Sequence, residues 1–264
     1  MGTVNRRSRH ALAGVLAMGL LAACGSTGSD SSSSPATSGQ GGPITVFAAA
    51  SLKKSFTALG EQFKTANPGS SVQFSFGGSS DLVTQLTQGA PGDVFASADT
   101  ANMDKASRAG LLAGSPVNFA SNTLTIAVAP GNPKKIDSLA DLTKPGLSVV
   151  VCAPQVPCGS AAQKVEHATG VHLTPVSEES SVTDVLNKVS TGQADAGLVY
   201  VTDVAGADGK VTSVNFPQAA EAVNTYPIAV LKDSEHAALA HKFVDLVTSD
   251  AGQKVLAEAG FAKP

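Results

Sequence analysis

The chain has no tryptophan, only two tyrosines and three cysteines among 264 residues, and no excess of positive charge. Lysine and arginine number 18 against 21 aspartate and glutamate residues, and they form no basic stripe, so we expect no nucleic-acid partner. No Walker-type phosphate loop is present, so we expect chemical energy to come from a partner. No apolar run reaches the roughly 20 residues that a transmembrane helix requires. These absences predict a protein that neither spans a membrane nor supplies chemical energy itself.

The first residues have the order of a secretory signal peptide. Arg6, Arg7 and Arg9 precede a short apolar stretch that ends in small residues. Leu-Ala-Ala-Cys at residues 21–24 resembles the bacterial lipobox, whose cysteine receives a diacylglycerol before the signal is cut. The other interpretation is an ordinary signal peptide with an incidental cysteine. Residues 25–42 favour the lipobox, because they are almost wholly Ser, Gly, Thr, Asp, Pro and Gln and are typical of a flexible tether.

We therefore expect residues 1–23 to be a cleaved signal peptide and residues 24–43 to be a lipidated cysteine, Cys24, followed by a flexible linker. The folded part is then exported and anchored to the outer face of the cytoplasmic membrane. The other two cysteines, Cys152 and Cys158, form an even pair in an oxidising compartment. Both a disulfide and two free thiols fit the sequence, and the disulfide is favoured if the two Cα atoms lie close enough.

The folded region alternates short strand signals with helical ones. Residues 44–48 are typical of a strand, and Phe56, Leu59 and Phe63 then recur at helical spacing. Further strands are expected at residues 72–76, 93–96, 124–129, 147–151, 196–200 and 226–231, and further helices from 82 and at about 102–109, 160–168, 181–191, 236–247 and 252–259. This alternation predicts α/β architecture with mostly parallel sheets. Residues 124–129 are apolar enough to be buried on both faces of a sheet.

Four places share one local plan, in which a strand or loop ends, a serine or small residue follows, and a helix begins. They are residues 49–52, 78–81, 157–160 and 180–183. A helix N-terminus presents unpaired N–H groups and about half a positive charge, so it attracts anions. A serine there usually only caps the helix. The small residues at 48–50 and 77–78 favour binding instead, because they let a ligand reach the backbone.

Ligands of open α/β sheets bind at the carboxyl ends of strands. If several of these four places converge there, the sequence predicts a pocket of hydrogen-bond donors for an oxyanion. Tyr200 ends an apolar strand, where its hydroxyl requires a partner, and it is the side chain that we expect to join such a pocket.

These residues also carry a family resemblance over nearly all of residues 44–264. The segments Ile-Thr-Val-Phe-Ala-Ala-Ala-Ser-Leu at 44–52, Phe-Gly-Gly-Ser-Ser-Asp-Leu at 76–82, Asp-Val-Phe-Ala-Ser-Ala-Asp at 93–99, Ala-Gly-Leu-Val-Tyr at 196–200 and Tyr-Pro-Ile-Ala-Val at 226–230 resemble the periplasmic molybdate-binding proteins of ABC importers. The resemblance implies a two-lobed periplasmic-binding-protein fold of type II, each lobe having a mostly parallel sheet flanked by helices. It places residues 44–122 with 228–264 in one lobe and residues 123–227 in the other.

The resemblance further implies the ligand and the site. The ligand is tetrahedral molybdate or tungstate, and no cofactor, bare metal ion or catalytic residue is expected. The contacts fall on the hydroxyl and N–H groups of Ser51 and Ser79, the N–H groups of Cys158 and Val182, and the Tyr200 hydroxyl. Cys158 departs from the alanine that is common in the family, and a disulfide to Cys152 is a hypothesis for how its loop is fixed. The implied partners are a membrane permease and an ATPase, with the receptor itself a monomer.

Three other functions compete with this one. A receptor for sulfate or another tetrahedral oxyanion requires the same pocket. A lipid-anchored hydrolase is disfavoured, because the chain has no Gly-x-Ser-x-Gly motif and none of its five histidines lies beside a glycine-flanked serine. Asp93 and Asp99 could pair as catalytic carboxylates or metal ligands, but a strand-end residue and a helix cap are the favoured interpretation. The sensor domain of a transcription regulator is disfavoured by the export signal and the lack of a DNA-binding segment.

Overall fold

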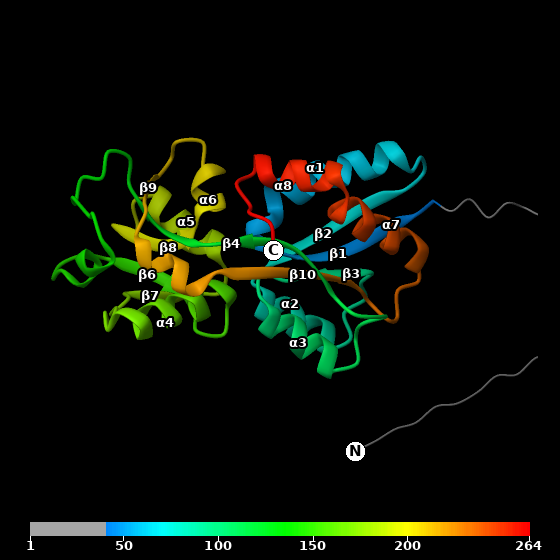
Figure 1. Cartoon of the computed structure of the whole chain (residues 1–264), viewed down its shortest axis with the longest axis horizontal. Coiled ribbons are helices and arrows are strands. Elements are labelled where there is room, and N and C mark those ends of the chain that lie inside the picture. Colours follow the sequence, from blue (N-terminus) through cyan, green and yellow to red (C-terminus); the bar gives the residue numbers. More distant parts are fainter. Residues whose placement is uncertain (1–40) are drawn as a thin grey trace, which may run out of the picture. The chain divides into compact units, whose positions relative to one another are not determined.

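The computed structural model describes residues 41–264, which form two five-stranded sheets with helices packed against them (Figure 1). The predicted signal peptide at residues 1–23, the predicted lipidation site Cys24 and nearly all of the linker at 24–43 lie outside the described residues. We call each sheet with its own helices a lobe. Within the described range, no helix combines the length and the apolar character that crossing a membrane requires.

The first lobe contains the strands β1 (Pro43–Ala49), β2 (Ser71–Gly77), β3 (Val94–Ala96), β4 (Val117–Asn122) and β10 (Asn224–Val230). Their order in the sheet is β2-β1-β3-β10-β4. Strand β1 is parallel to β2 and β3, and β10 is antiparallel to both of its neighbours, β3 and β4. Four of the five strands in this sheet therefore point the same way.

Both faces of the first sheet are covered by helices (Figure 1). One face packs against α1 (Lys53–Ala66), α7 (Ala237–Thr248) and α8 (Asp250–Glu258), and the other against α2 (Ser79–Thr87) and α3 (Thr100–Arg108). In β1, Ile44 and Val46 belong to the first core and Phe47 to the second, as the two-residue period of a strand requires. The helical spacing predicted from Phe56 and Phe63 is confirmed, because both side chains are buried against this sheet.

The second lobe repeats this plan with the strands β5 (Leu124–Val128), β6 (Val149–Cys152), β7 (Ser177–Glu179), β8 (Ala196–Tyr200) and β9 (Thr212–Val214). Their order is β7-β6-β8-β5-β9, with β6 parallel to β7 and β8 and with β5 antiparallel to β8 and β9. All five residues of β5 are buried, as predicted. The α/β architecture with two mostly parallel sheets, each flanked by helices, is confirmed.

The helices of the second lobe are α4 (Pro157–Thr169), α5 (Val182–Ser190) and α6 (Val201–Ala205), with short 3₁₀ turns at η2 (Leu139–Thr143) and η3 (Pro217–Ala222). The predicted start of α4 at residue 160 is three residues late. Pro157 is the first helical residue, where its fixed φ suits the helix and its missing N–H costs no hydrogen bond. Cys158 is therefore inside the first turn of this helix.

The chain changes sheets twice. It leaves the first sheet at Asn122 and enters the second at Leu124, and it returns between Val214 and Asn224. Three strands, β4, β7 and β9, were not predicted, because none shows a clear apolar pattern. The predicted lobe boundaries at 122/123 and 227/228 stay a prediction.

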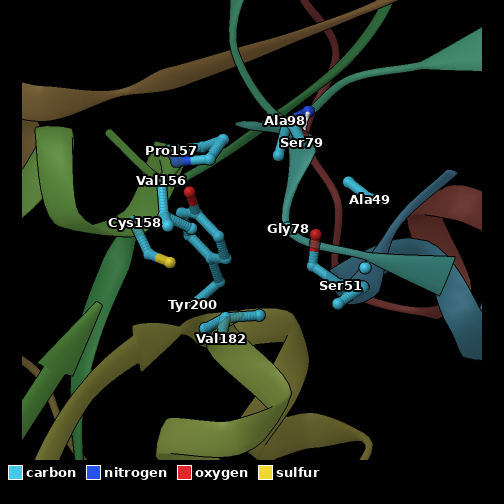
Figure 2. A pocket seen from close by; sticks show the side chains of 12 residues that line it. Ala49, Ser51, Gly78, Ser79, Ala98, Val156, Pro157, Cys158, Val182 and Tyr200 are labelled. Atoms are coloured by element: carbon cyan, nitrogen blue, oxygen red, sulfur yellow. Dashed lines mark hydrogen bonds between the residues drawn. The ribbon is translucent and has the colours of Figure 1, made fainter. Parts of the chain in front are cut away.

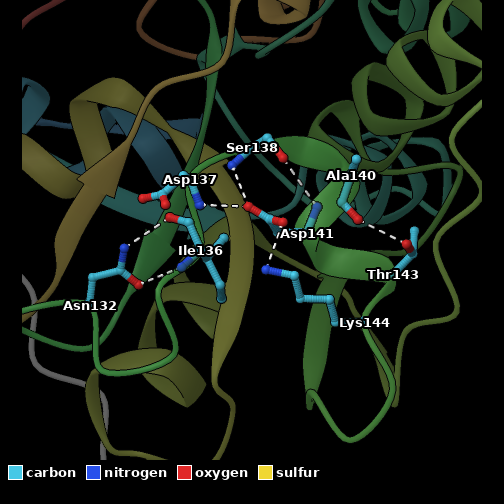
Figure 3. A network of polar contacts seen from close by, with 8 residues as sticks. All are labelled: Asn132, Ile136, Asp137, Ser138, Ala140, Asp141, Thr143 and Lys144. Carbon is cyan, nitrogen blue, oxygen red and sulfur yellow. Dashed lines mark hydrogen bonds and ion pairs between the residues drawn. The ribbon is translucent and has the colours of Figure 1, made fainter.

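A network of hydrogen bonds fixes the loop before η2 (Figure 3). The Asp141 carboxylate accepts the N–H groups of Asp137 (2.8 Å) and Ser138 (3.0 Å), and it pairs with Lys144 at 2.8 Å. Ser138 returns a bond by accepting the N–H of Asp141, which completes a capping box. The bond from Lys144 and those from the backbone lower the pKa of Asp141 to about 2.

Asp141→Asn should lower the stability of the protein in a pH-dependent way. Because the folded state holds the pKa of Asp141 below its ordinary value, the charge contributes to stability above that value, and the contribution is lost as the pH falls towards about 2. Urea unfolding at several pH values measures this. The difference in unfolding free energy between wild type and variant should be largest near neutral pH and should disappear as the solution becomes acidic.

Asp137→Asn is the matched control, since it removes a carboxylate from the same loop while Asp137 gives the network only its N–H. If Asp141→Asn lowers the unfolding free energy as much in acid as at neutral pH, the charge of Asp141 does not stabilise the loop.

Candidate functional site

A small pocket lies between the two lobes and encloses about 200 Å³, including the space at its mouth (Figure 2). It is lined by Ala49, Ala50, Ser51, Gly77, Gly78, Ser79, Ala98, Val156, Pro157, Cys158, Val182 and Tyr200. No charged side chain is among the residues that line it. The walls are therefore small or apolar side chains, backbone groups and three hydroxyls.

All five residues predicted to bind a ligand line this one pocket, although they are far apart in the sequence. They stand at the carboxyl ends of strands that are neighbours in each sheet. In the first lobe, the segments after β1, β2 and β3 carry Ser51, Ser79 and Ala98. In the second lobe, the segments after β6 and β7 carry Cys158 and Val182, and β8 ends at Tyr200. Parallel neighbours end at the same sheet edge, so the topology brings these residues together.

Three of the four helix N-termini that face the pocket lack side-chain caps. The N-cap residues of η1 (Ala50–Leu52), α2 and α4 are Ala49, Gly78 and Val156, and none of them caps its helix with a side-chain hydrogen bond. By contrast, α3 and α8 are capped by Asp99 and Ser249. Uncapped helix starts leave N–H groups unpaired.

The unpaired N–H groups belong to residues that the family resemblance assigned to the binding site. The N–H groups of Ser51, Ser79, Cys158 and Val182 have no hydrogen-bond acceptor within residues 41–264. In α5 the Ser181 hydroxyl accepts the N–H of Asp184, which leaves the N–H of Val182 available. Four helix starts thus present donors to one small volume, an arrangement that can hold an anion.

The hydroxyl of Ser51 is oriented by two buried residues from the connections between lobes. Its oxygen lies 3.0 Å from the Tyr226 hydroxyl, which accepts a bond from the Asn122 side-chain amide (3.4 Å). The same amide donates to Thr202 at 2.8 Å. Either hydroxyl can donate in this contact, and when Tyr226 donates, the Ser51 proton is free to point into the pocket.

Ser79 is oriented in a comparable way. Its hydroxyl oxygen accepts the N–H of Ala98 at 3.0 Å, and the carbonyl of Ala98 accepts from the side chain of Asn224 at 2.8 Å. The Asn224 amide also lies 3.5 Å from the carbonyl of Pro157 in the second lobe. The Ser79 oxygen is occupied as an acceptor, so its own proton is available to a ligand.

Tyr200 is buried, and its hydroxyl has no hydrogen-bond partner among the described residues. Burial, with the nearby Tyr226 and Asp203, raises the pKa of Tyr200 well above its ordinary value, so the hydroxyl stays protonated. A buried hydroxyl without a partner costs about 1–3 kcal/mol. Its position on the pocket wall indicates that an acceptor in the pocket would relieve this cost.

Cys152 and Cys158 form a disulfide, with their Cα atoms 5.6 Å apart. The bond joins the last residue of β6 to the second residue of α4. It therefore closes the loop that carries the Cys158 N–H to the pocket. Both half-cystines are buried.

Sequence reasoning missed the residues behind the pocket wall. Asn122, Tyr226 and Asn224 lie far in the sequence from the predicted contacts at Ser51 and Ser79, yet all three are buried and orient those residues. The available signal was an asparagine at the end of each of two strands with several apolar residues, because a buried amide requires partners.

The enzyme interpretation finds no support in the geometry. Asp99 caps α3, as the favoured interpretation had it, and Asp93 accepts from the N–H of Thr45 (2.7 Å) and from the hydroxyl of Ser234 (2.5 Å). Within residues 41–264, no cluster of three or more His, Cys, Asp or Glu side chains could hold a metal ion.

Comparisons with known proteins agree with this geometry. Residues 44–262 match the family described as bacterial extracellular solute-binding protein. The chain is 64% identical over 245 residues to the molybdate-binding protein ModA of Mycobacterium tuberculosis H37Rv, covering 92% of this chain and 93% of that protein. It is 27% identical over 257 residues to the putative ABC transporter substrate-binding lipoprotein YvgL of Bacillus subtilis, covering 95% and 96%.

The fold is similar to that of the periplasmic molybdate-binding protein of Azotobacter vinelandii, with a TM-score of 0.73, 24% identity, and coverage of 84% of this chain and 99% of that one. The family match extends over most of the chain, and its members bind solutes and do not catalyse reactions. This chain belongs to the bacterial extracellular solute-binding protein family.

Proposed function

We propose that this chain captures molybdate or tungstate outside the cytoplasm and delivers it to the permease and ATPase of an ABC importer. The observation that carries the proposal is the unpartnered Tyr200 hydroxyl, which faces a pocket where four helix starts present unpaired N–H groups. The similarity to molybdate-binding relatives supports the choice of ligand. The similarity to the Bacillus protein, a putative ABC transporter substrate-binding lipoprotein, supports the importer as partner.

The proposed contacts are neutral donors that stabilise a dianion. They are the hydroxyl and N–H groups of Ser51 and Ser79, the N–H groups of Cys158 and Val182, and the Tyr200 hydroxyl. Hydrogen bonds to a charged acceptor are about twice as strong as neutral ones, and donors on the backbone lose little entropy on binding. No cofactor and no bare metal ion is part of this site.

The donor-only wall also selects among anions. The Ser79 oxygen already accepts a hydrogen bond within the protein, and the Ser51 hydroxyl shares one with Tyr226. A protonated anion such as monohydrogen phosphate would leave its own O–H group unpaired in a buried site, which costs affinity. Sulfate has the same charge and shape as molybdate, so the fixed positions of the donors must discriminate by size.

The two-lobed arrangement supports capture by closure. Each lobe, with its own sheet and helices, supplies part of the pocket. A monomer is sufficient for this mechanism, because both sets of donors come from one chain.

The lipid on Cys24 would hold the receptor close to its importer. The lipobox-like sequence and the Ser- and Gly-rich segment after it support this part of the proposal, as does the similarity to the Bacillus protein, a putative lipoprotein.

Ser51→Ala and Ser79→Ala should each weaken molybdate binding by about 1.5–3 kcal/mol, because each removes a donor to a buried charge. Each should also lower the stability of the unliganded protein, since the Tyr226 hydroxyl or the Ala98 N–H loses its partner. Isothermal titration calorimetry measures the affinities. Ser55→Ala is the control, because the Ser55 hydroxyl is buried in the same region but bonds only the carbonyl of Leu52.

The same calorimetry with molybdate, tungstate, sulfate and phosphate tests the choice of ligand. Tighter binding of sulfate than of molybdate would keep the site and replace the substrate. Wild-type affinity for molybdate in both serine variants would contradict the site assignment. The absence of binding heat with all four anions would overturn the proposed function.

Tyr200→Phe should separate ligand binding from stability. The Tyr200 hydroxyl has no partner among the described residues of the unliganded protein, so its removal should leave the thermal midpoint unchanged or raise it. The same variant should bind molybdate more weakly by about 1.5–3 kcal/mol, because a donor to the charge is lost. Unchanged affinity, or a fall in the unliganded midpoint, would place the hydroxyl outside the site.

Cys24→Ala should lose labelling by a palmitate analogue, because the thiol that takes the lipid is gone. It should also keep its signal peptide, because the lipid is added before the signal is cut, and intact mass measures this. Cys158→Ala is the control, as it removes a different cysteine and should be labelled like the wild type. Labelling of Cys24→Ala would refute the anchor.

A further inference from the structure

The two lobes approach each other closely at Gly78 on the pocket wall, where there is no side chain. A Cβ atom placed on Gly78 would lie 2.1 Å from the carbonyl oxygen of Ser180 and 3.5 Å from Cγ1 of Val156. Gly78 caps α2 in the first lobe, whereas Ser180 and Val156 precede α5 and α4 in the second. The contact therefore joins backbone to backbone across the two lobes.

The backbone conformation of Gly78 does not itself require glycine. Its φ of −63° and ψ of 137° lie in the extended region that every L-residue adopts. The three atoms nearest to a Cβ at this position all belong to the second lobe. The absence of a side chain at Gly78 is thus needed for the approach of the lobes and not for the fold of the first lobe.

The neighbouring glycine shows the contrast. A Cβ on Gly77 would meet only the side chain of Leu82, at 3.3 Å, within the same lobe. Both glycines line the pocket, but only the substitution at Gly78 would obstruct the second lobe. The constraint is therefore specific to one position.

The contact lies where the two halves of the pocket meet. Gly78 immediately precedes Ser79, and Ser180 lies two residues before Val182. Val156, the third partner in the contact, caps the helix that carries Cys158. The separation of Gly78 from Ser180 thus sets the distance between the donors of the first lobe and the N–H groups of the second.

We propose that Gly78 determines how far the lobes close, and that the backbone contact with Ser180 sets the pocket width at which one tetrahedral oxyanion is reached by donors from both lobes. The proposal rests on the proposed function and names a specificity-determining residue of that site. With a methyl group at this position, the lobes have to stay apart by about 1 Å or more to restore a normal van der Waals distance. One anion then cannot make short hydrogen bonds to both lobes at once.

Gly78→Ala tests this. Because the three atoms nearest to the methyl group belong to the second lobe and the backbone conformation suits alanine, the unliganded variant should fold and have a thermal midpoint at or above that of the wild type. Its affinity for molybdate, measured by calorimetry, should fall by roughly 10- to 100-fold, the range expected for overpacking a close contact. Small-angle scattering should show that molybdate contracts the wild type more than the variant.

Gly114→Ala is the matched control. It makes the same substitution on an exposed loop, where a Cβ would meet no atom within 4 Å, and it should bind and contract like the wild type. Equal affinity in Gly78→Ala and the wild type would overturn the closure role. A fall in the unliganded midpoint would also overturn it, because the obstruction would then lie inside one lobe. A wild type that binds no molybdate would instead refute the proposed function, so the two failures are distinguishable.

Discussion

The site in this structure depends on hydrogen bonds that backbone N–H groups at converging helix starts can donate to a ligand. A buried N–H without an acceptor is costly, and most helices in proteins avoid this cost with a side-chain cap. Here η1, α2 and α4, which begin at the pocket, are preceded by alanine, glycine and valine, and the cap of α5 bonds the N–H of Asp184 and leaves that of Val182 without an acceptor. The unpaired donors thus gather in one place, and an anion is the partner that satisfies all of them at once.

The surroundings of the pocket hold these donors in fixed positions. The first sheet is packed on both faces, and Tyr226 and Asn122 lie behind Ser51 with their own hydrogen bonds satisfied. On the other side, the disulfide from Cys152 to Cys158 joins the end of β6 to the first turn of α4. A site made of neutral donors depends on such rigidity, because each donor contributes to selectivity only if it cannot follow an anion of another size.

Each lobe folds around its own core, whereas ligand binding requires both lobes. Each has its own sheet and its own core, so neither needs the ligand to remain folded. The pocket, in contrast, requires both lobes, and the contacts that join them beside it are small: the approach of Gly78 to Ser180, and the amide of Asn224 between Ala98 and Pro157. Contacts of this kind are consistent with a ligand that supplies much of the free energy of closure.

Local sequence by itself determined the repeated strand-and-helix plan, because apolar periodicity and the glycine, serine and proline signals act over a few residues. It also indicated that a helix begins close to each of residues 49–52, 78–81, 157–160 and 180–183, and the family resemblance assigned a ligand to residues within them. Only the tertiary structure decided that these starts meet in one pocket, that Tyr226 and Asn122 orient Ser51, and that Gly78 lies against Ser180. Short strands such as β7, with the sequence Ser-Glu-Glu, are likewise defined by a neighbour and not by their own residues. The reason is the same in each case: these features depend on hydrogen bonds and contacts between segments far apart in the chain, and no local pattern records a partner that only folding brings near.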